Sequence, residues 1–228
     1  VTTLIAQTFP VTAYLSIGAF ILWMFIGIST GAIAALNKGK WQDRAASIFT
    51  SIGVSLPTFY IGLLVLFSVV IWLRILPFPS YESPFVNFPV FLRTMILPWL
   101  VLAVLSAASY TRLTRNGMLE AMNEDFVRLG VAKGLTRRII LRRYVMRQAL
   151  VPIVTIAGLD FAGLLGGAII TESVFSLPGM GKMSIRAVVE SDLPVLVGTT
   201  MVAAVFIVIA NVLVDIAYGY LDPRVRVK

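Results

Sequence analysis

Long uncharged apolar stretches are the feature that most constrains this chain. Residues 1–37 and 45–73 contain no charged side chain, and three further apolar stretches follow them. A helix needs about 20 predominantly apolar residues to cross the hydrocarbon core of a bilayer. Only 13% of the 228 residues are charged, whereas a soluble domain carries roughly 25%. The chain is therefore expected to be an all-α polytopic membrane protein, with residues 1–228 forming a single transmembrane domain.

Five membrane-spanning helices are predicted from these stretches. The second is interrupted by Pro57, the third is short, and the fourth is apolar except for Asp160. The expected bounds are 11–36, 48–73, 94–110, 149–171 and 195–218.

The composition excludes several classes of function. The chain contains no cysteine and no histidine, so it has no thiolate metal site, no Ser-His or Cys-His catalytic pair and no disulfide. We expect no metal site and no enzymatic activity in this chain. The net charge of +8 is typical of Lys/Arg-rich cytoplasmic loops in a membrane protein, and no nucleic-acid partner is expected.

The distribution of positive charge predicts the orientation. Fifteen Lys/Arg lie in the 36–47 loop, the 111–148 loop and the C-terminal tail, against four on the opposite side. Cytoplasmic loops carry the excess of positive charge, so these loops and the C-terminus are expected in the cytoplasm and Val1 outside. An outside start with five helices, in a chain beginning without Met, leads us to expect a further helix before Val1.

The charged segment, residues 112–148, is the main polar part of the chain. Residues 112–147 carry nine Lys/Arg and three acids. Asn123 is a candidate N-cap and Gly134 a candidate left-handed C′ residue, so a short helix is predicted over 124–133. This helix has apolar residues on one side and no lipid to cover them, which favours a protein partner. Residues 137–147 alternate arginines with apolar residues, a pattern typical of a helix lying at the membrane surface.

An ordered set of motifs runs along nearly the whole chain: FVRLGVAKGL (126–135), RQALVP (147–152), GGA (166–168), ESVF (172–175), PGMG (178–181) and DPR (222–224). With these motifs the chain resembles ABC importer permeases of the dipeptide, oligopeptide and nickel subclass, and its charged segment resembles their coupling loop. Four residues depart from the pattern: Gly130 and Val131 replace the usual Ala and Arg, Arg128 stands where the broader superfamily often has Glu, and Gln148 replaces Asn.

The resemblance implies a type I ABC importer transmembrane domain in the plasma (inner) membrane of a prokaryote. Such a subunit usually has six helices and forms half of a translocation pathway with a second homologous permease. An extracytoplasmic binding protein delivers the solute, and two ATP-binding cassette ATPases bind ATP and Mg²⁺, so this chain needs no cofactor. The 124–135 loop helix would occupy a cleft of the ATPase. Its residues with that implied role are Phe126, Val127, Arg128, Leu129, Val131, Ala132, Lys133, Gly134 and Leu135.

A stretch resembling a nucleotide-binding loop is expected to be a turn. Residues 178–183 lack the first glycine of G-x-x-x-x-G-K-[ST] and have Met183 where the Mg²⁺-binding Ser or Thr should be. They are also predicted to lie outside the cell, away from ATP.

Three residues are candidates for the solute pathway. An acid within a span costs roughly 2.5–3.5 kcal/mol on insertion scales. Asp160 is therefore either a pathway residue that meets the cationic amine of a peptide or a hydrogen-bonded structural acid. Pro57, with Ser55 beside it, is a candidate pathway kink. Glu172 is expected to position the 175–181 loop. The glycine pairs Gly27/Gly31 and Gly163/Gly167 are candidates for close helix packing.

Two other classes of function are compatible with the sequence. A proton-coupled secondary transporter would use Asp160 and work without ATPase partners, but no inverted repeat is evident. A non-transporting membrane scaffold would recruit a soluble protein through the basic loop. Co-purification distinguishes all three, since only an importer permease should bring down two ATPase chains and a sister permease.

Overall fold

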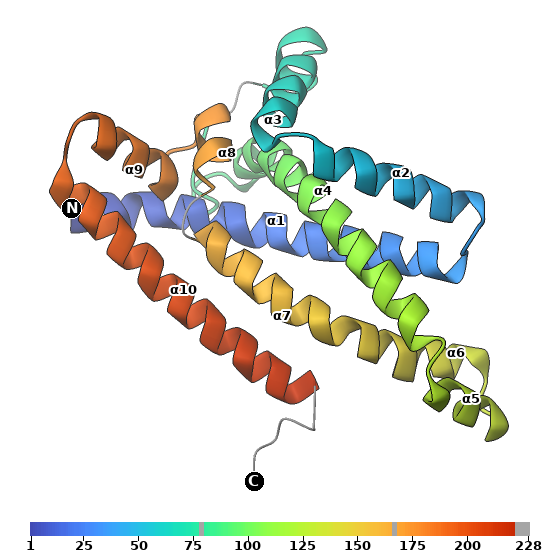
Figure 1. The fold of residues 1–228 in the computed structure, drawn as a ribbon. Coiled ribbons are helices and arrows are strands. Elements are labelled where there is room, and N and C mark those ends of the chain that lie inside the picture. Colours follow the sequence, from blue (N-terminus) through green and yellow to red (C-terminus); the bar gives the residue numbers. More distant parts are fainter. Residues whose placement is uncertain (78–79, 166–167, 222–228) are drawn as a thin grey trace.

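A computed structural model of the protein describes residues 1–77, 80–165 and 168–221, and these are helical apart from short connections. Within these residues, four helices are long and apolar enough to cross a membrane, and a bent pair can provide a fifth crossing. Figure 1 shows the long helices side by side, with short helices at both ends of the bundle. In chain order the elements are α1 (Thr2–Leu36), α2 (Trp41–Ser55), α3 (Thr58–Leu66), η1 (Phe67–Trp72), α4 (Phe88–Ala121), α5 (Asp125–Ala132), α6 (Arg137–Ile139), η2 (Ile140–Val145), α7 (Met146–Leu165), α8 (Ile169–Val174), α9 (Met180–Val189) and α10 (Leu193–Leu221).

Helices α1 and α4 pack closely against each other in the bundle core. A Cβ atom added at Gly27 would lie 2.5 Å from the Cβ of Tyr110, and one at Gly31 would lie 2.6 Å from the carbonyl oxygen of Thr111. The hydroxyl groups of Thr30 and Thr111 are 2.6 Å apart at the same crossing. Small residues let helix backbones approach in a membrane, where no hydrophobic effect drives association. The prediction of close packing at Gly27/Gly31 is therefore confirmed.

The second glycine pair behaves differently. None of the described residues lies within 4 Å of a Cβ placed at Gly163, and Gly167 lies outside the described residues. The prediction of close packing is thus wrong for Gly163 within this chain. A Gly-x-x-x-Gly pattern shows only that close approach is possible, and the neighbouring helix decides whether it occurs.

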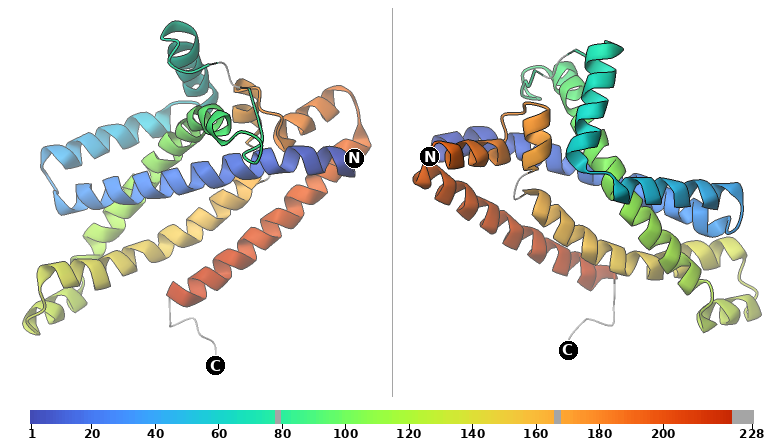
Figure 2. Two further views of the ribbon diagram at one scale, coloured as in Figure 1. Left: turned by 180° about the vertical axis from the view of Figure 1, so that it is seen from behind. Right: turned by 45° about the horizontal axis from the view of Figure 1, so that its top comes forward.

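The predicted second span is broken at Pro57. Helices α2 and α3 meet at an angle of 102°, and Pro57 occupies the N-cap position of α3 in an extended conformation. Proline has no N–H group and disfavours helical geometry in the residue before it. Figure 2 shows α3 projecting away from the long helices.

The predicted third span is much too short. Helix α4 has 34 residues and continues past Tyr110 to Ala121, because its charged residues do not end it. Arg115 instead forms a two-pronged ion pair with Asp43 of α2, with Nε–Oδ1 and Nη2–Oδ2 distances of 2.5 and 3.0 Å. Asp43 also accepts a hydrogen bond from the backbone N–H of Gly39. This pairing stabilises charge at the end of the bundle and joins α2 to α4.

The predicted fourth span begins too late and ends too late. The helical run extends without interruption from Arg137 to Leu164, so residues 137–147 form the start of this helix rather than a separate surface helix. At its other end α7 stops at Leu165, and residues 169–174 belong to the separate helix α8. The fifth predicted span corresponds to α10.

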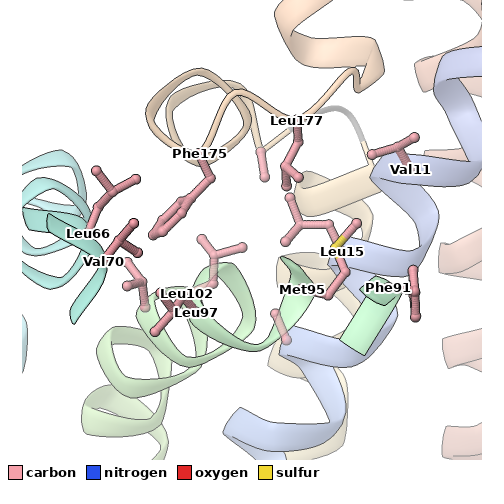
Figure 3. Packing of buried hydrophobic residues seen from close by; sticks show 13 residues of the cluster. Val11, Leu15, Leu66, Val70, Phe91, Met95, Leu97, Leu102, Phe175 and Leu177 are labelled. Carbon is pink, nitrogen blue, oxygen red and sulfur yellow. The ribbon is translucent and has the colours of Figure 1, made fainter. Parts of the chain in front are cut away.

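Buried apolar residues form clusters along the bundle. One cluster at the α8–α9 end contains Phe175 and Leu177, which point toward residues of α1, α3 and α4 (Figure 3). A second, at mid-bundle, surrounds Trp23 and Tyr110. A third supports α5 at the other end and includes Met118, Ile140, Val145 and Ala149.

The α1–α4 contact can be tested with two matched glycine substitutions. Gly31→Ala should destabilise the protein by about 1–3 kcal/mol, because the new methyl group meets a backbone carbonyl. Gly163→Ala should not destabilise it, because the same methyl group meets open space and alanine favours the helix. Thermal unfolding in detergent measures both, and equal losses would contradict the assignment of the α1–α4 contact.

Candidate functional site

Helix α5 lies at one end of the bundle, between the end of α4 and the start of the α6–α7 run (Figure 1). It contains eight residues, which at 1.5 Å per residue make a rod roughly 12 Å long. Residues 112–121 of the charged segment belong to α4 and residues 137–148 to the helical run of the fourth span. Only residues 122–136 therefore connect the two long helices.

One face of α5 packs against its own chain. Phe126 and Val127 are half-buried against the cluster formed by α4 and η2, and the rings of Phe126 and Tyr144 lie 6.4 Å apart. Gly130 is buried, and a Cβ there would lie 3.2 Å from the side chain of Ile140. Glycine at this position, where the subclass usually has alanine, lets α5 lie close to η2.

The opposite face of α5 exposes apolar and basic side chains together. Leu129 and Val131 are 61% and 63% exposed, and Ala132 and Lys133 are exposed beside them. The Arg128 side chain is 81% exposed and 3.8 Å from Asp125, a spacing and exposure at which an ion pair adds little stability. This outer face is largely exposed in the described part of the chain and can meet a partner.

Gly134 ends the helix in the way predicted. Its φ is +73°, a conformation that glycine adopts at little cost. The backbone N–H of Gly134 donates to the carbonyl of Val131, and the N–H of Leu135 donates to the carbonyl of Gly130. These two bonds form a Schellman motif, which fixes the reversal between α5 and α6.

Two details of the predicted helix are wrong. Asn123 does not cap it, because its side-chain amide donates to the carbonyl of Leu119 at the end of α4. Glu124 takes the N-cap position without a side-chain hydrogen bond. Phe126, expected in the outer apolar set, packs inward on Tyr144, because η2 lies under that face of α5.

A polar hollow of about 300 Å³ lies between α1, α4 and α7. Asp160 is exposed to it, and the hydroxyl of Tyr110 donates a 2.7 Å hydrogen bond to Asp160 Oδ2. Trp23 also lines the hollow, and its indole N–H has no acceptor among the described residues although the side chain is only 1% exposed. The remaining lining residues are Ser106, Ser109, Gly163 and Leu164.

Ser55 and Pro57 lie apart from this hollow. The Ser55 hydroxyl donates to the carbonyl of Ser51 in its own helix, and neither residue lines the Asp160 hollow. The structure therefore does not bring Ser55 or Pro57 into the hollow that contains Asp160.

Glu172 organises the connection from α8 to α9. Its Oε1 accepts a 2.6 Å hydrogen bond from the hydroxyl of Thr12, and its Oε2 accepts a 2.8 Å bond from the backbone N–H of Lys182. The Thr12 hydroxyl in turn accepts from the N–H of Met180. Burial raises the pKa of Glu172, while hydrogen bonds from Thr12 and from the backbone of Lys182 and Gly181 lower it. The carboxyl thus lies at the N-terminus of α9, where the helix dipole favours an acid.

The expected positioning role of Glu172 follows from these contacts. Gly179 lies so close to the Glu172 carboxyl that any Cβ there would clash with it, which explains a glycine at this position. The buried side chains of Phe175 and Leu177 anchor the same connection (Figure 3). Gly166, Gly167 and the 222–224 motif lie outside the described residues.

Several contributing residues are missed by sequence reasoning. Thr12, Asp43 and Tyr110 have no local signal of a polar role, because each bonds to a residue far away in the sequence. Trp23 likewise has no local signal that it lines the hollow. A single polar residue within an apolar stretch weakly indicates a polar contact, but it does not identify the partner residue.

The described residues define a helical integral membrane protein with a hollow between its spans and, at one end, a short helix with an exposed apolar and basic face. The family described as binding-protein-dependent transport system inner membrane component matches residues 27–227. The chain belongs to this family.

Relatives with similar sequences are described as peptide permeases. A putative peptide transport system permease protein of Brucella abortus (strain 2308) is 38% identical over 227 residues, covering 97% of this chain and 71% of the relative. The dipeptide transport system permease protein DppB of Bacillus subtilis (strain 168) is 34% identical over 226 residues, covering 99% and 71%.

Solved structures of low sequence identity share the fold. A chain of the MetNI methionine ABC transporter in an inward-facing conformation superposes with a TM-score of 0.72 at 14% identity, covering 97% of both chains. A chain of an amino acid ABC transporter with histidines gives a TM-score of 0.72 at 16% identity, covering 96% and 94%. The expected type I importer transmembrane fold is confirmed.

The hydrogen bonds between Thr12, Glu172 and the start of α9 can be tested by substitution. Thr12→Val should destabilise the protein by about 1–3 kcal/mol, because it leaves a buried carboxylate oxygen and a backbone N–H without a partner. Thr8→Val, which removes a hydroxyl that bonds mainly within its own helix, should change the free energy of unfolding by less than about 0.5 kcal/mol. Thermal unfolding in detergent distinguishes them, and equal effects would show that the Thr12–Glu172 contact is not stabilising.

Proposed function

We propose that this chain is the permease subunit of an ATP-driven importer for peptides or a related small solute, and that it couples to ATPase subunits through the 124–135 loop helix. The family match supports the transport class. The descriptions of the similar permeases of Brucella abortus and Bacillus subtilis support peptides as the solute.

The two-faced packing of α5 is the observation that carries the coupling proposal. The inner face is fixed to the bundle by Phe126, Val127 and Gly130, and the outer face leaves Leu129 and Val131 uncovered. Full burial of an exposed aliphatic side chain contributes about 1.5–3 kcal/mol, so these two residues suit a protein cleft. Arg128 and Lys133 beside them can pair with acids at its rim. A movement of the cleft would pass through α5 to both α4 and α7, a rigid-body type of switch.

The excess of Lys/Arg supports a cytoplasmic position for α5 and the C-terminus in the inner membrane of a prokaryote. In this arrangement a second homologous permease completes the translocation pathway. Two ATPase subunits bind ATP and Mg²⁺ on the cytoplasmic side, and a binding protein delivers the solute outside. This chain is a non-catalytic subunit that forms half of the pathway.

Purification of the complex tests the assignment. The tagged protein should bring down a second permease and two ATPase chains, and reconstituted vesicles should take up peptide only with ATP and the binding protein. Uptake driven by a proton gradient without ATPase chains would instead establish a secondary transporter. Recruitment of a soluble protein without any transport would establish a scaffold.

The outer face of α5 can be tested by replacing two exposed valines that lie at opposite ends of the bundle. Val131→Ser should lower the amount of co-purified ATPase about tenfold, because the partner loses an apolar contact. Val189→Ser on α9, where the native valine is 79% exposed, should leave ATPase binding unchanged. Quantified co-purification measures both, and equal ATPase recovery would exclude the outer face of α5 as the docking surface.

Gly134→Val should uncouple ATP hydrolysis from transport while leaving membrane insertion intact. A β-branched residue at φ +73° is strained, so the reversal after α5 should shift and peptide uptake should fall about tenfold or more while ATP hydrolysis continues. Gly39→Val is the control, because Gly39 also has a positive φ, of +81°, and open space around it. Transport by the Gly134 variant at the wild-type rate would refute the coupling role.

A further inference from the structure

The hollow beside Asp160 combines one carboxylate with several neutral hydrogen-bonding groups. Tyr110 donates to Oδ2 only, so Oδ1 is free to accept from a ligand. Among the described residues, Asp160 forms no ion pair and is the only acidic or basic side chain that lines the hollow. The described residues therefore give the hollow one carboxylate and no compensating cation.

The position of this charge excludes lipid as its neighbour. Asp160 belongs to the helical run from Arg137 to Leu164, Tyr110 to α4 and Trp23 to α1, and all three of these helices have membrane-spanning length. An acid facing hydrocarbon is costly, so acids within spans face the protein interior or a water-filled path. Asp160 is nevertheless exposed in this subunit, so its open side faces water or a second subunit.

The neutral groups around Asp160 specify what else the hollow can bind. The Trp23 indole N–H lacks an acceptor, and indole donates only. The hydroxyls of Ser106 and Ser109 form no side-chain hydrogen bonds within the described residues, and serine hydroxyls can donate or accept. A ligand with a cationic group for Asp160 and a carbonyl oxygen for one of the two serines satisfies the accessible groups, whereas the Trp23 N–H is buried in the wall.

We propose that the Asp160–Tyr110 pair is a recognition site, on the solute path, for the protonated amino group of the solute. The proposal rests on the importer function above and adds the chemistry that the path selects. Tyr110 holds the carboxylate in place, and the hydroxyls of Ser106 and Ser109 donate to the adjoining peptide carbonyl. A divalent metal ion does not fit, because the described residues contain no group of three acidic, histidine or cysteine ligands. The volume of about 300 Å³ is at the small end of ligand sites, in keeping with one end of a peptide.

The absence of cysteine from the chain allows a direct test in the assembled complex. Ser109→Cys places a single thiol in the hollow with little change in volume. A cationic methanethiosulfonate reagent should modify it at least about tenfold faster than an anionic reagent of similar size, because one charge in a low-dielectric hollow concentrates counter-ions. Adding Asp160→Asn should abolish this preference while keeping an acceptor for Tyr110. Thr155→Cys, on an exposed part of α7 away from the hollow, is the control and should show no such preference.

Protection by peptides tests the ligand itself. A dipeptide with a free amino group should slow modification of Ser109→Cys by a neutral reagent, whereas its N-acetylated form should not. Protection should be lost in the Asp160→Asn variant and kept in Asp160→Glu. Equal protection by both dipeptides, protection by neither, or protection that survives Asp160→Asn would overturn the proposal.

Uptake separates failure of this proposal from failure of the importer function. Vesicles containing the complex with Asp160→Asn should import the free-amine dipeptide at least about tenfold more slowly than wild type, with unchanged complex assembly and thermal unfolding. If wild type imports peptide with ATP and Asp160→Asn imports it equally well, the importer function stands and the recognition site is refuted. If wild-type vesicles import no peptide, the function itself fails.

Discussion

The contact between α1 and α4 is the constraint on which the rest of the structure depends. At Gly27 and Gly31 the absence of side chains lets the backbone of α1 approach Tyr110 and Thr111 closely. This approach brings Trp23 beside Tyr110, with ring centroids 5.9 Å apart, and Tyr110 in turn holds Asp160 of α7. Wider separation of the two helices would open the wall of the polar hollow and loosen its tyrosine.

The two ends of the bundle are built by different means. At one end a buried glutamate and a threonine hydroxyl fix the start of α9, and Phe175 and Leu177 fill the space beneath it. At the other end α5 is held by apolar contacts on one face and by a glycine-terminated reversal. The first arrangement leaves few groups free, whereas the second presents an uncovered apolar and basic face. This asymmetry suits the importer function proposed for the chain, in which one end receives a solute and the other contacts an ATPase.

Sequence reasoning succeeded where local chemistry decides the structure. Gly134 was identified because few other residues adopt a positive φ at a helix end, and the break at Pro57 followed from the missing N–H of proline. It failed at helix ends that depend on distant partners. The third span extends to Ala121 because Arg115 finds Asp43, 72 positions away in the chain, and Asn123 bonds to α4 instead of capping α5.

The sequence by itself determined the membrane class, the approximate positions of the spans and the place of the short helix that ends at Gly134. These follow from hydropathy, charge and turn chemistry, which are properties of neighbouring residues. Only the tertiary structure decided which face of α5 is covered, which glycine pair is a true helix contact, and that Asp160 meets Tyr110 across 50 residues of chain. The physical reason is that helix packing sets these contacts, and packing depends on the shapes of side chains that are remote in sequence.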